Sequence, residues 1–244
     1  MERLSVVITA KNEEKNVKRL LDSLVPHSSN CEIIFVDGGS TDSTKEMVSS
    51  YSFVDLIDGT GSSRGGGRNI GIKKAEGTAY AFIDCDTEVE SIWYKEAIES
   101  LKHCDVIFGR SDDPSGKTLP RVSIIYNGQD ISYPSCNMVV KKSVLDKVGL
   151  FDENMVTAED IDLNYRIVKA GYKLSYNPHM RIYHYHRVTV VGFLRQAFWN
   201  GYGRKQLVDK NIDLKNDTLK GFSLLSIARL ALGGLGYLFG GYLR

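Results

Sequence analysis

The fold of this chain is decided by the stretch AYAFIDCD, residues 79–86. Its first five residues are apolar, which predicts a strand buried on both faces. Asp84 and Asp86 then follow one residue apart, where that strand ends. Ligands of α/β proteins bind at the carboxyl ends of parallel strands, and carboxylate oxygens suit a hard divalent cation that can hold a diphosphate. A solvated turn explains an isolated Asp-x-Asp triplet equally well, so its surroundings must decide.

Strand, loop and helix recur in this order upstream of residues 79–86. Apolar runs predict strands, and helical spacing of apolar residues predicts the helices between them. A glycine-rich, flexible loop is expected at residues 59–67. The order favours an α/β fold with a parallel sheet wound right-handedly. The expected strands are 4–9, 32–36, 54–57, 79–83, 105–109, 133–140, 173–176 and 181–184, and the expected helices are 17–24, 44–51, 68–75, 142–148 and 160–170.

Charge divides the 244-residue chain into an acidic body and a basic tail. The net charge is +1, but residues 1–180 hold 21 Lys and Arg against 27 Asp and Glu, and residues 181–244 hold 10 against 3. A basic, apolar tail favours an anionic surface as its neighbour. Nucleic acid is not expected as a partner, because no compact basic and aromatic motif for it occurs.

The cysteines and the N-terminus indicate the compartment. The four cysteines, at positions 31, 85, 104 and 136, show neither close pairing nor a zinc spacing. We expect them to be reduced, as in cytosol. The chain runs from Met1 directly into a strand-like segment, which leaves no room for a signal peptide. We therefore expect the body to lie on the cytoplasmic side of the cell membrane.

The tail divides into two expected helical parts after a catalytic domain at residues 1–189. Residues 190–220 are expected to form amphipathic basic helices, with a break near Gly201, and residues 221–244 a hydrophobic helix. That last segment can span a bilayer, lie at its interface, or be buried in a homo-oligomer, and Arg229 is its only internal charge. Gly236 and Gly240 form a small-residue face suited to close helix packing.

Five motifs in order resemble family-two glycosyltransferases of the GT-A fold, over about residues 4–205. They are Asn12-Glu13, the segment from Asp37 to Asp42, Arg68-Asn69-x-Gly71, Asp84-Cys85-Asp86, and Glu159-Asp160 with Arg166 and Gly171 after it. The resemblance implies a GT-A (Rossmann-like) mixed, mostly parallel central sheet flanked by helices, followed by a C-terminal, membrane-proximal helical tail. It also implies an inverting, metal-dependent transferase, a hexosyltransferase, that uses Mn²⁺ or Mg²⁺.

The resemblance also implies a role for each candidate residue. Asp160 is the general base and Glu159 orients or tunes it. Asp86 and His184 hold the metal, with His186 as a less suitable position than His184. The remaining candidates contact the donor: Thr9, Glu13 and Asp37 its base and ribose, Arg64 and Arg68 its diphosphate, Asp84 its ribose, and Asn137 the sugar or acceptor. Several have a structural alternative: Asp37 can cap a helix, Arg64 can be a solvated loop residue, and Glu159 and Asp160 can merely favour a helix N-terminus.

The expected reaction moves a single sugar from a nucleotide sugar, a UDP-sugar by resemblance, to a lipid-linked or cell-envelope acceptor. Many family members carry a second Asp where this chain has Gly38, which leaves the base preference open. Processive synthases carry Gln-x-x-Arg-Trp, and the Arg is missing before Trp199. Two alternatives stay open: a nucleotidyltransferase, although its glycine loop is expected directly after the first strand, and a non-catalytic sugar-nucleotide-binding scaffold at a membrane.

Overall fold

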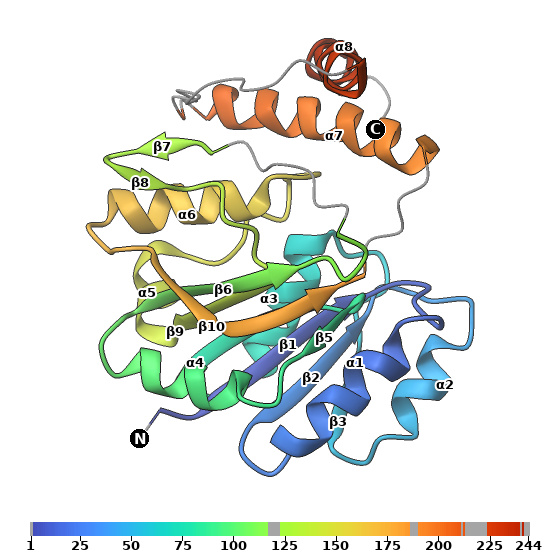
Figure 1. The fold of residues 1–244 in the computed structure, drawn as a ribbon, viewed down its shortest axis with the longest axis vertical. Coiled ribbons are helices and arrows are strands. Elements are labelled where there is room, and N and C mark those ends of the chain that lie inside the picture. Colours follow the sequence, from blue (N-terminus) through green and yellow to red (C-terminus); the bar gives the residue numbers. More distant parts are fainter. Residues whose placement is uncertain are drawn as a thin grey trace.

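A mixed eight-stranded sheet runs through the molecule (Figure 1). The computed structural model describes residues 2–116, 123–185, 190–210, 212, 224–239 and 241. The strands of the sheet are β1 (Leu4–Ala10), β2 (Glu32–Asp37), β3 (Val54–Asp58), β4 (Ala79–Asp84), β5 (Thr87–Val89), β6 (Val106–Asp112), β9 (Asn137–Lys141) and β10 (Ser175–His184). They lie in the order β3-β2-β1-β4-β9-β6-β10-β5, and β7 (Ile125–Tyr126) with β8 (Gln129–Asp130) forms a separate hairpin.

Helices cover both faces of the sheet (Figure 1). They are α1 (Val17–Leu24), the short 3-10 helix η1 (Val25–His27), α2 (Thr44–Ser49), α3 (Arg64–Lys74), α4 (Trp93–Leu101), α5 (Lys142–Val148), α6 (Glu159–Lys169), α7 (Val190–Asp209) and α8 (Leu224–Phe239). The mixed, mostly parallel sheet flanked by helices confirms the expected GT-A type of architecture.

Alternate residues of the central strands supply two separate cores. In β1, Leu4, Val6 and Ile8 face α1 and α4, whereas Val7 faces α3 and α5. The strand β4 divides in the same way, and its Phe82 packs edge-on against Phe151. Since a strand alternates its side chains between faces, an apolar run such as 79–83 is required wherever both faces are covered.

Strand direction brings the candidate residues to one edge of the sheet. The strands β1 to β4 are mutually parallel in the order β3-β2-β1-β4, so Ala10, Asp37, Asp58 and Asp84 end side by side. The strand β9 then runs antiparallel to both β4 and β6. Finally β10 runs parallel to β6, so its C-terminal residue His184 reaches the same edge.

The glycine run at residues 65–67 is helical, so the expectation of a flexible loop over 59–67 and of a helix beginning at Arg68 is wrong. The helix α3 begins at Arg64, and the Ser63 side chain accepts a hydrogen bond from the Gly66 N–H. These glycines are buried, and a Cβ on Gly67 would come within 3.1 Å of Thr9; further along the helix, a Cβ on Gly71 would come within 2.4 Å of Val7. Close approach, rather than flexibility, requires glycine here.

Three further expectations differ from the structure. The two expected final strands are one strand, β10, whose pairing with β6 shifts between Asn177 and Arg181. The strand β5 and the helix α4 were not expected at all. The helix α7 continues through Gly201 without a break. Packing explains the glycine, since a Cβ there would come within 1.8 Å of the Gly233 carbonyl oxygen of α8.

The helices α7 and α8 pack closely together at one end of the molecule (Figure 1). Gly236 permits this contact, since a Cβ there would come within 1.7 Å of the Phe198 carbonyl oxygen. The small-residue face therefore packs within the chain, and Gly240 lies outside the described residues. Within the described part of the chain, no helix is both long enough and apolar enough to cross a membrane.

Candidate active site

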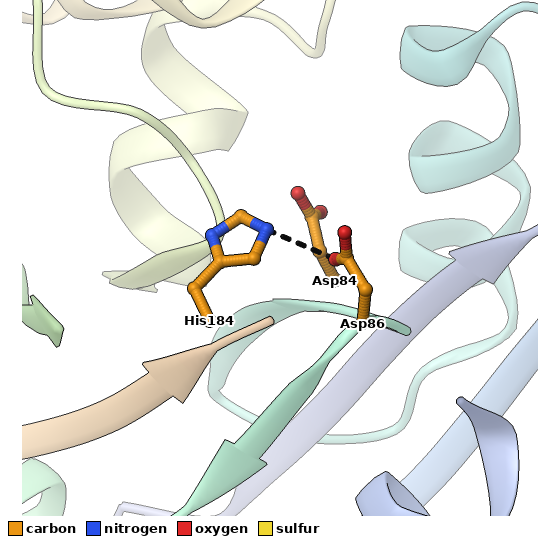
Figure 2. Close-up of side chains that lie close together, drawn as sticks. All are labelled: Asp84, Asp86 and His184. Carbon is orange, nitrogen blue, oxygen red and sulfur yellow. Dashed lines mark ion pairs between the residues drawn. The ribbon is translucent and has the colours of Figure 1, made fainter. Parts of the chain in front are cut away.

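Three possible metal ligands meet at the edge of the sheet: Asp84, Asp86 and His184 (Figure 2). One ligand atom from each lies within 4.8 Å of the others. His184 Nε2 is 3.0 Å from Asp86 Oδ1. Two carboxylates and one imidazole suit Mn²⁺ or Mg²⁺, and a borderline metal such as Mn²⁺ better accepts the imidazole. His186, the alternative to His184, lies outside the described residues.

The strand β5 explains why His184 reaches Asp86. Directly after Asp86 the chain turns into β5, which pairs antiparallel with β10 so that His184 lies opposite Thr87. The Tyr185 N–H then donates to the Asp86 carbonyl oxygen over 2.9 Å. Burial disfavours a charged His184, but its hydrogen bonds with Asp86 and Cys136 prevail and raise its pKa to about 11.

Arg68 joins this cluster to the second half of the site. Its guanidinium donates to Glu159 Oε1 over 2.7 Å and to Asp84 Oδ1 over 3.2 Å, and it lies 5.4 Å from the centre of the Phe151 ring. Arg68 is 5% exposed. Burial opposes its charge, but Asp84 and Glu159 outweigh that effect and raise its pKa. Arg68 thus holds two carboxylates in place, and these contacts favour a positioning role over the expected role at the diphosphate.

Asp160 lies beside Glu159 in the first turn of α6. Burial, together with the negative charge of Glu159, raises the pKa of Asp160 to about 7, although Arg68 acts in the opposite direction. A carboxyl group with such a pKa exchanges its proton near neutral pH, which suits a general base. Asp160 Oδ1 also accepts a hydrogen bond from the Ile161 N–H over 2.8 Å.

The turn before α6 is conformationally unusual. Ala158 has a φ of 64°, in the left-handed region that a residue with a side chain rarely adopts. Asp162, expected on the helix surface, is instead 1% exposed, because Arg166 and Lys210 both bind its carboxylate. Arg166 also donates to the carbonyl oxygens of Val148 and Leu150 at the end of α5. The start of α6 is therefore fixed by Arg166 of the same helix and by the distant Lys210.

Two loops at the other half of the site are tied together. The Asn12 N–H donates to Ser40 Oγ over 2.9 Å, and Asn12 Oδ1 accepts from the Thr41 N–H over 2.8 Å. The Glu13 N–H donates to Thr44 Oγ1 over 2.8 Å. The Asn-Glu motif after β1 is thus anchored to the Ser-Thr-Asp motif after β2.

Asp37 organises the turn after β2 rather than capping a helix. Its Oδ2 accepts from the N–H groups of Gly39 and Ser40 and lies 3.3 Å from Lys45 Nζ. Burial opposes ionisation of this carboxyl, but a hydrogen bond with the Ser40 side chain, together with these partners, prevails and lowers its pKa. Its Oδ1 is buried and has no hydrogen-bond partner. An unpartnered buried oxygen is costly unless a ligand satisfies it.

The remaining donor candidates lie around this edge. Thr9 is paired with Asp84 on β4, and its side chain lies against Gly67. Glu13 is partly buried and accepts from Asn16 Nδ2 over 2.7 Å. Arg64 is exposed at the first turn of α3. Because α3 begins at Arg64, the helix N-terminus that favours an anion belongs to Arg64 and not to Arg68.

Asn137, which is expected to contact the sugar or acceptor, is bound by other parts of the chain. It is 2% exposed, and its amide binds three structural partners. Trp93 Nε1 donates to its Oδ1 over 2.9 Å, and its Nδ2 donates to the carbonyl oxygens of Arg110 and Met180. Asn137 thus connects α4, β6, β9 and β10. These contacts favour a structural role, and a contact of Asn137 with the sugar or acceptor stays a prediction.

Cys136 is a neighbour of the site that the sequence did not identify. It is buried and shares a hydrogen bond with His184, while burial raises its thiol pKa. Nothing in its sequence context marks it, because the contact depends on β9 beginning at the edge of the sheet where β10 ends. All four cysteines are free.

Relatives of this chain were found by sequence similarity. A protein from Methanococcus voltae named dolichyl N-acetyl-alpha-D-glucosaminyl phosphate 3-beta-D-2,3-diacetamido-2,3-dideoxy-beta-D-glucuronosyltransferase is 25% identical over 246 residues, which cover 86% of this chain and 75% of the relative. The chain spans 64% and 54% of the length of the first two curated relatives that it matches.

Two solved structures share the fold. Residues 1–349 of Staphylococcus aureus TarS, in complex with UDP, superpose with a TM-score of 0.66 at 23% identity, covering 82% of this chain and 65% of TarS. The mannosyltransferase PcManGT from Pyrobaculum calidifontis, in complex with GDP-Man and Mn²⁺, gives a TM-score of 0.71 at 16% identity, covering 100% of this chain and 76% of PcManGT. The family model described as glycosyl transferase family 2 matches residues 5–149. The chain therefore belongs to glycosyl transferase family 2.

Proposed function

We propose that this protein transfers a single sugar from a nucleotide sugar, with inversion, in a reaction that depends on Mn²⁺ or Mg²⁺. One observation carries the proposal: Arg68 binds both Asp84 of the metal-ligand cluster and Glu159 beside Asp160. The metal ligands and the proposed base therefore belong to one site. A single site of this kind can bind a departing diphosphate and an attacking hydroxyl together.

The donor half supports binding of a nucleoside diphosphate. Asp86 and His184 hold the metal, and a bound Mn²⁺ or Mg²⁺ supplies positive charge that stabilises the departing diphosphate. Asp37 Oδ1 offers a buried acceptor without a partner, which suits a ribose hydroxyl or a base N–H. Thr9, Glu13 and Asp84 lie at the same edge, and exposed Arg64 is free of the burial that confines Arg68.

Asp160 is the proposed general base, and Glu159 raises its pKa. Its carboxylate accepts the proton of the acceptor hydroxyl while that oxygen attacks the anomeric carbon. The attack comes from the face opposite the diphosphate, so that the bond to the diphosphate breaks as the new bond forms. One displacement of this kind inverts the anomeric configuration.

Hydrolysis of nucleotide sugars tests the proposal, because water can replace an unknown acceptor. UDP-GlcNAc and GDP-Man are supplied with Mn²⁺, Mg²⁺ or a chelator, and release of the nucleoside diphosphate is measured. We propose a UDP-sugar as the donor, although PcManGT holds GDP-Man. Metal-dependent release from either donor supports transferase chemistry. Release of pyrophosphate from a sugar phosphate and a nucleoside triphosphate would favour a nucleotidyltransferase, and metal-independent binding without turnover a scaffold.

A lipid-linked or cell-envelope acceptor at the cytoplasmic side of the membrane completes the proposal. The catalytic domain of residues 1–189 is followed by α7 and α8, and Leu235, Leu238 and Phe239 of α8 are exposed apolar residues. A basic tail with such residues suits an anionic bilayer surface. The Methanococcus relative carries a dolichyl phosphate acceptor in its name. Co-sedimentation with phosphatidylglycerol vesicles tests this part; a concentration-dependent dimer without vesicle binding would favour a homo-oligomer instead.

A further inference from the structure

One face of α7 contacts the segment that leads to the proposed base. We call residues 152–160 the base loop, since it ends in Glu159 and Asp160. Gly203, Gln206 and Lys210 are spaced by three and four residues, so they lie on the same side of the helix. All three contact the base loop or the first turn of α6. In Figure 1, α7 lies across the end of the molecule above α6.

Gln206 makes the most specific of these contacts. Its Oε1 accepts from the Val156 N–H over 3.0 Å, and its Nε2 donates to the Asn154 carbonyl oxygen over 3.0 Å. One amide thus binds a donor and an acceptor of the loop backbone, two residues apart. Such a paired contact fixes the path of the backbone and not only its distance from the helix.

Gly203 presses directly on the residues before the base. A Cβ at this position would come within 2.6 Å of Thr157 Cγ2 and 2.9 Å of the Thr157 carbonyl oxygen. The next residue, Ala158, has the positive φ that places Glu159 and Asp160 at the start of α6. A residue with a side chain persists in this conformation only where its surroundings fix it, and α7 supplies part of those surroundings.

Lys210 closes the contact at the end of the helix. Its Nζ lies 2.8 Å from Asp152 Oδ2 and also binds the buried carboxylate of Asp162. Apolar packing adds to these polar contacts. Leu207 and Ile212 are buried in the same hydrophobic cluster as Met155 and Val168. The base loop is therefore bound at its beginning, middle and end by one helix.

We infer that α7 acts as a clamp that sets the position of Asp160, and that Gln206 is its main positioning residue. This inference rests on the proposed function for the role of Asp160. The side-chain hydrogen bonds of Gln206 go to Val156 and Asn154 of the base loop, so releasing them changes the base half alone. A catalytic group displaced by about 1 Å can lose about 10²-fold in rate.

The test compares Gln206→Ala with Gln206→Glu and Asp209→Ala in the full chain. We expect Gln206→Ala to lower kcat for donor hydrolysis by about tenfold or more, with an unchanged Kd for the nucleoside diphosphate in Mn²⁺. Gln206→Glu keeps the acceptor for Val156 and should recover part of the rate. Asp209→Ala removes an exposed side chain of the same turn and should leave kcat unchanged. A normal kcat in Gln206→Ala, or a Kd that rises in parallel, overturns the inference.

Hydrogen exchange separates this inference from the proposed function, because it needs no substrate. In Gln206→Ala the amides of residues 154–160 should exchange at least about tenfold faster than in the parent chain, while those of β1 and β4 stay unchanged. If the parent chain turns over no donor, the proposed function fails. Hydrogen exchange alone then tests whether α7 fixes the base loop. Unchanged exchange over the base loop contradicts the clamp whatever the turnover.

Discussion

The donor half and the base half of the site are built by contacts of different range. In the donor half, Asn12 and Ser40 are 28 residues apart in the sequence, and their two motifs bind each other directly. In the base half, Arg68 and Glu159 are 91 residues apart, and Gln206 binds Val156 over 50 residues. Short motifs thus specify the first half, whereas the second half depends on how distant elements pack. Substitutions far from Asp160 can therefore change catalysis without changing donor binding.

The largest effect is expected from breaking the metal-ligand cluster that both halves share. Asp86→Ala removes one carboxylate beside Asp84 and His184. Turnover of the donor should fall by about 10³-fold or more, because charge stabilisation by a metal contributes several kcal/mol. Nucleotide affinity in Mn²⁺ should fall as well. Asp146→Ala, which removes an exposed carboxylate on α5, is the control, and equal losses in both variants would count against the cluster.

Replacing Arg68, whose guanidinium links the two halves of the site, should destabilise the fold. Arg68→Met removes the ion-pair partner of two carboxylates, the buried Glu159 and Asp84. We expect this loss to lower the free energy of unfolding by about 3–5 kcal/mol. The loss should shrink as the pH falls from 8 to 5, because protonation neutralises the unpaired carboxylates. Urea unfolding at both pH values measures it.

The matched control is Arg3→Met, since Arg3 forms an exposed ion pair with Glu76. That substitution should cost less than about 1 kcal/mol. A loss in Arg68→Met as small as that of the control, or one that grows toward pH 5, would show that Arg68 does not neutralise the site.

A change within the base half should alter the pH dependence of turnover. The base is active when ionised, so the rate should rise with pH through the Asp160 pKa of about 7. Glu159→Gln removes the neighbouring negative charge, which lowers this pKa and moves the acid limb of the kcat profile to lower pH. Glu99→Gln on α4 should leave the profile in place. An acid limb that stays in place or moves to higher pH in Glu159→Gln would contradict the claim that Glu159 raises the pKa of Asp160.

The smallest effect on the reaction is expected at Asn137. Asn137→Ala leaves Trp93 Nε1 and the carbonyl oxygens of Arg110 and Met180 without a partner. It should lower the free energy of unfolding by at least about 2 kcal/mol, while donor affinity stays within about twofold at a temperature where the variant is folded. Thermal unfolding and nucleotide titration measure the two quantities. A weakened affinity in the folded variant would restore Asn137 to the donor site.

The sequence predicted what depends on local pattern. The parallel strands, the helix from Lys142 to Val148, and the position of Asp84 and Asp86 where a buried strand ends follow from apolar runs and turn residues. Polar residues after parallel strands must lie at one edge of the sheet, so the donor side could be located from spacing alone. These parts need no knowledge of long-range packing.

The remainder depended on contacts that a linear pattern does not record. Glycines at 65–67 resemble a loop in sequence, but they belong to α3, and Gly67 and Gly71 allow that helix to lie on β1. Asp162 was expected on the surface of its helix, because no local sequence pattern indicates that Lys210, 48 residues away, binds its carboxylate. Asn137 was placed near the sugar or acceptor by resemblance, and its partners could not be predicted because they come from three other elements. Buried polar side chains need partners, but the sequence does not say which.

Asp160→Asn, measured for both donor affinity and turnover, tests the central claim most directly. The amide keeps the shape of the side chain but cannot accept the acceptor proton as a carboxylate does. The account predicts an unchanged Kd for UDP or GDP in Mn²⁺ and a kcat lower by about 10²–10⁴-fold. Turnover close to that of the parent chain, with metal and donor bound, would contradict a shared site in which Asp160 acts as the base.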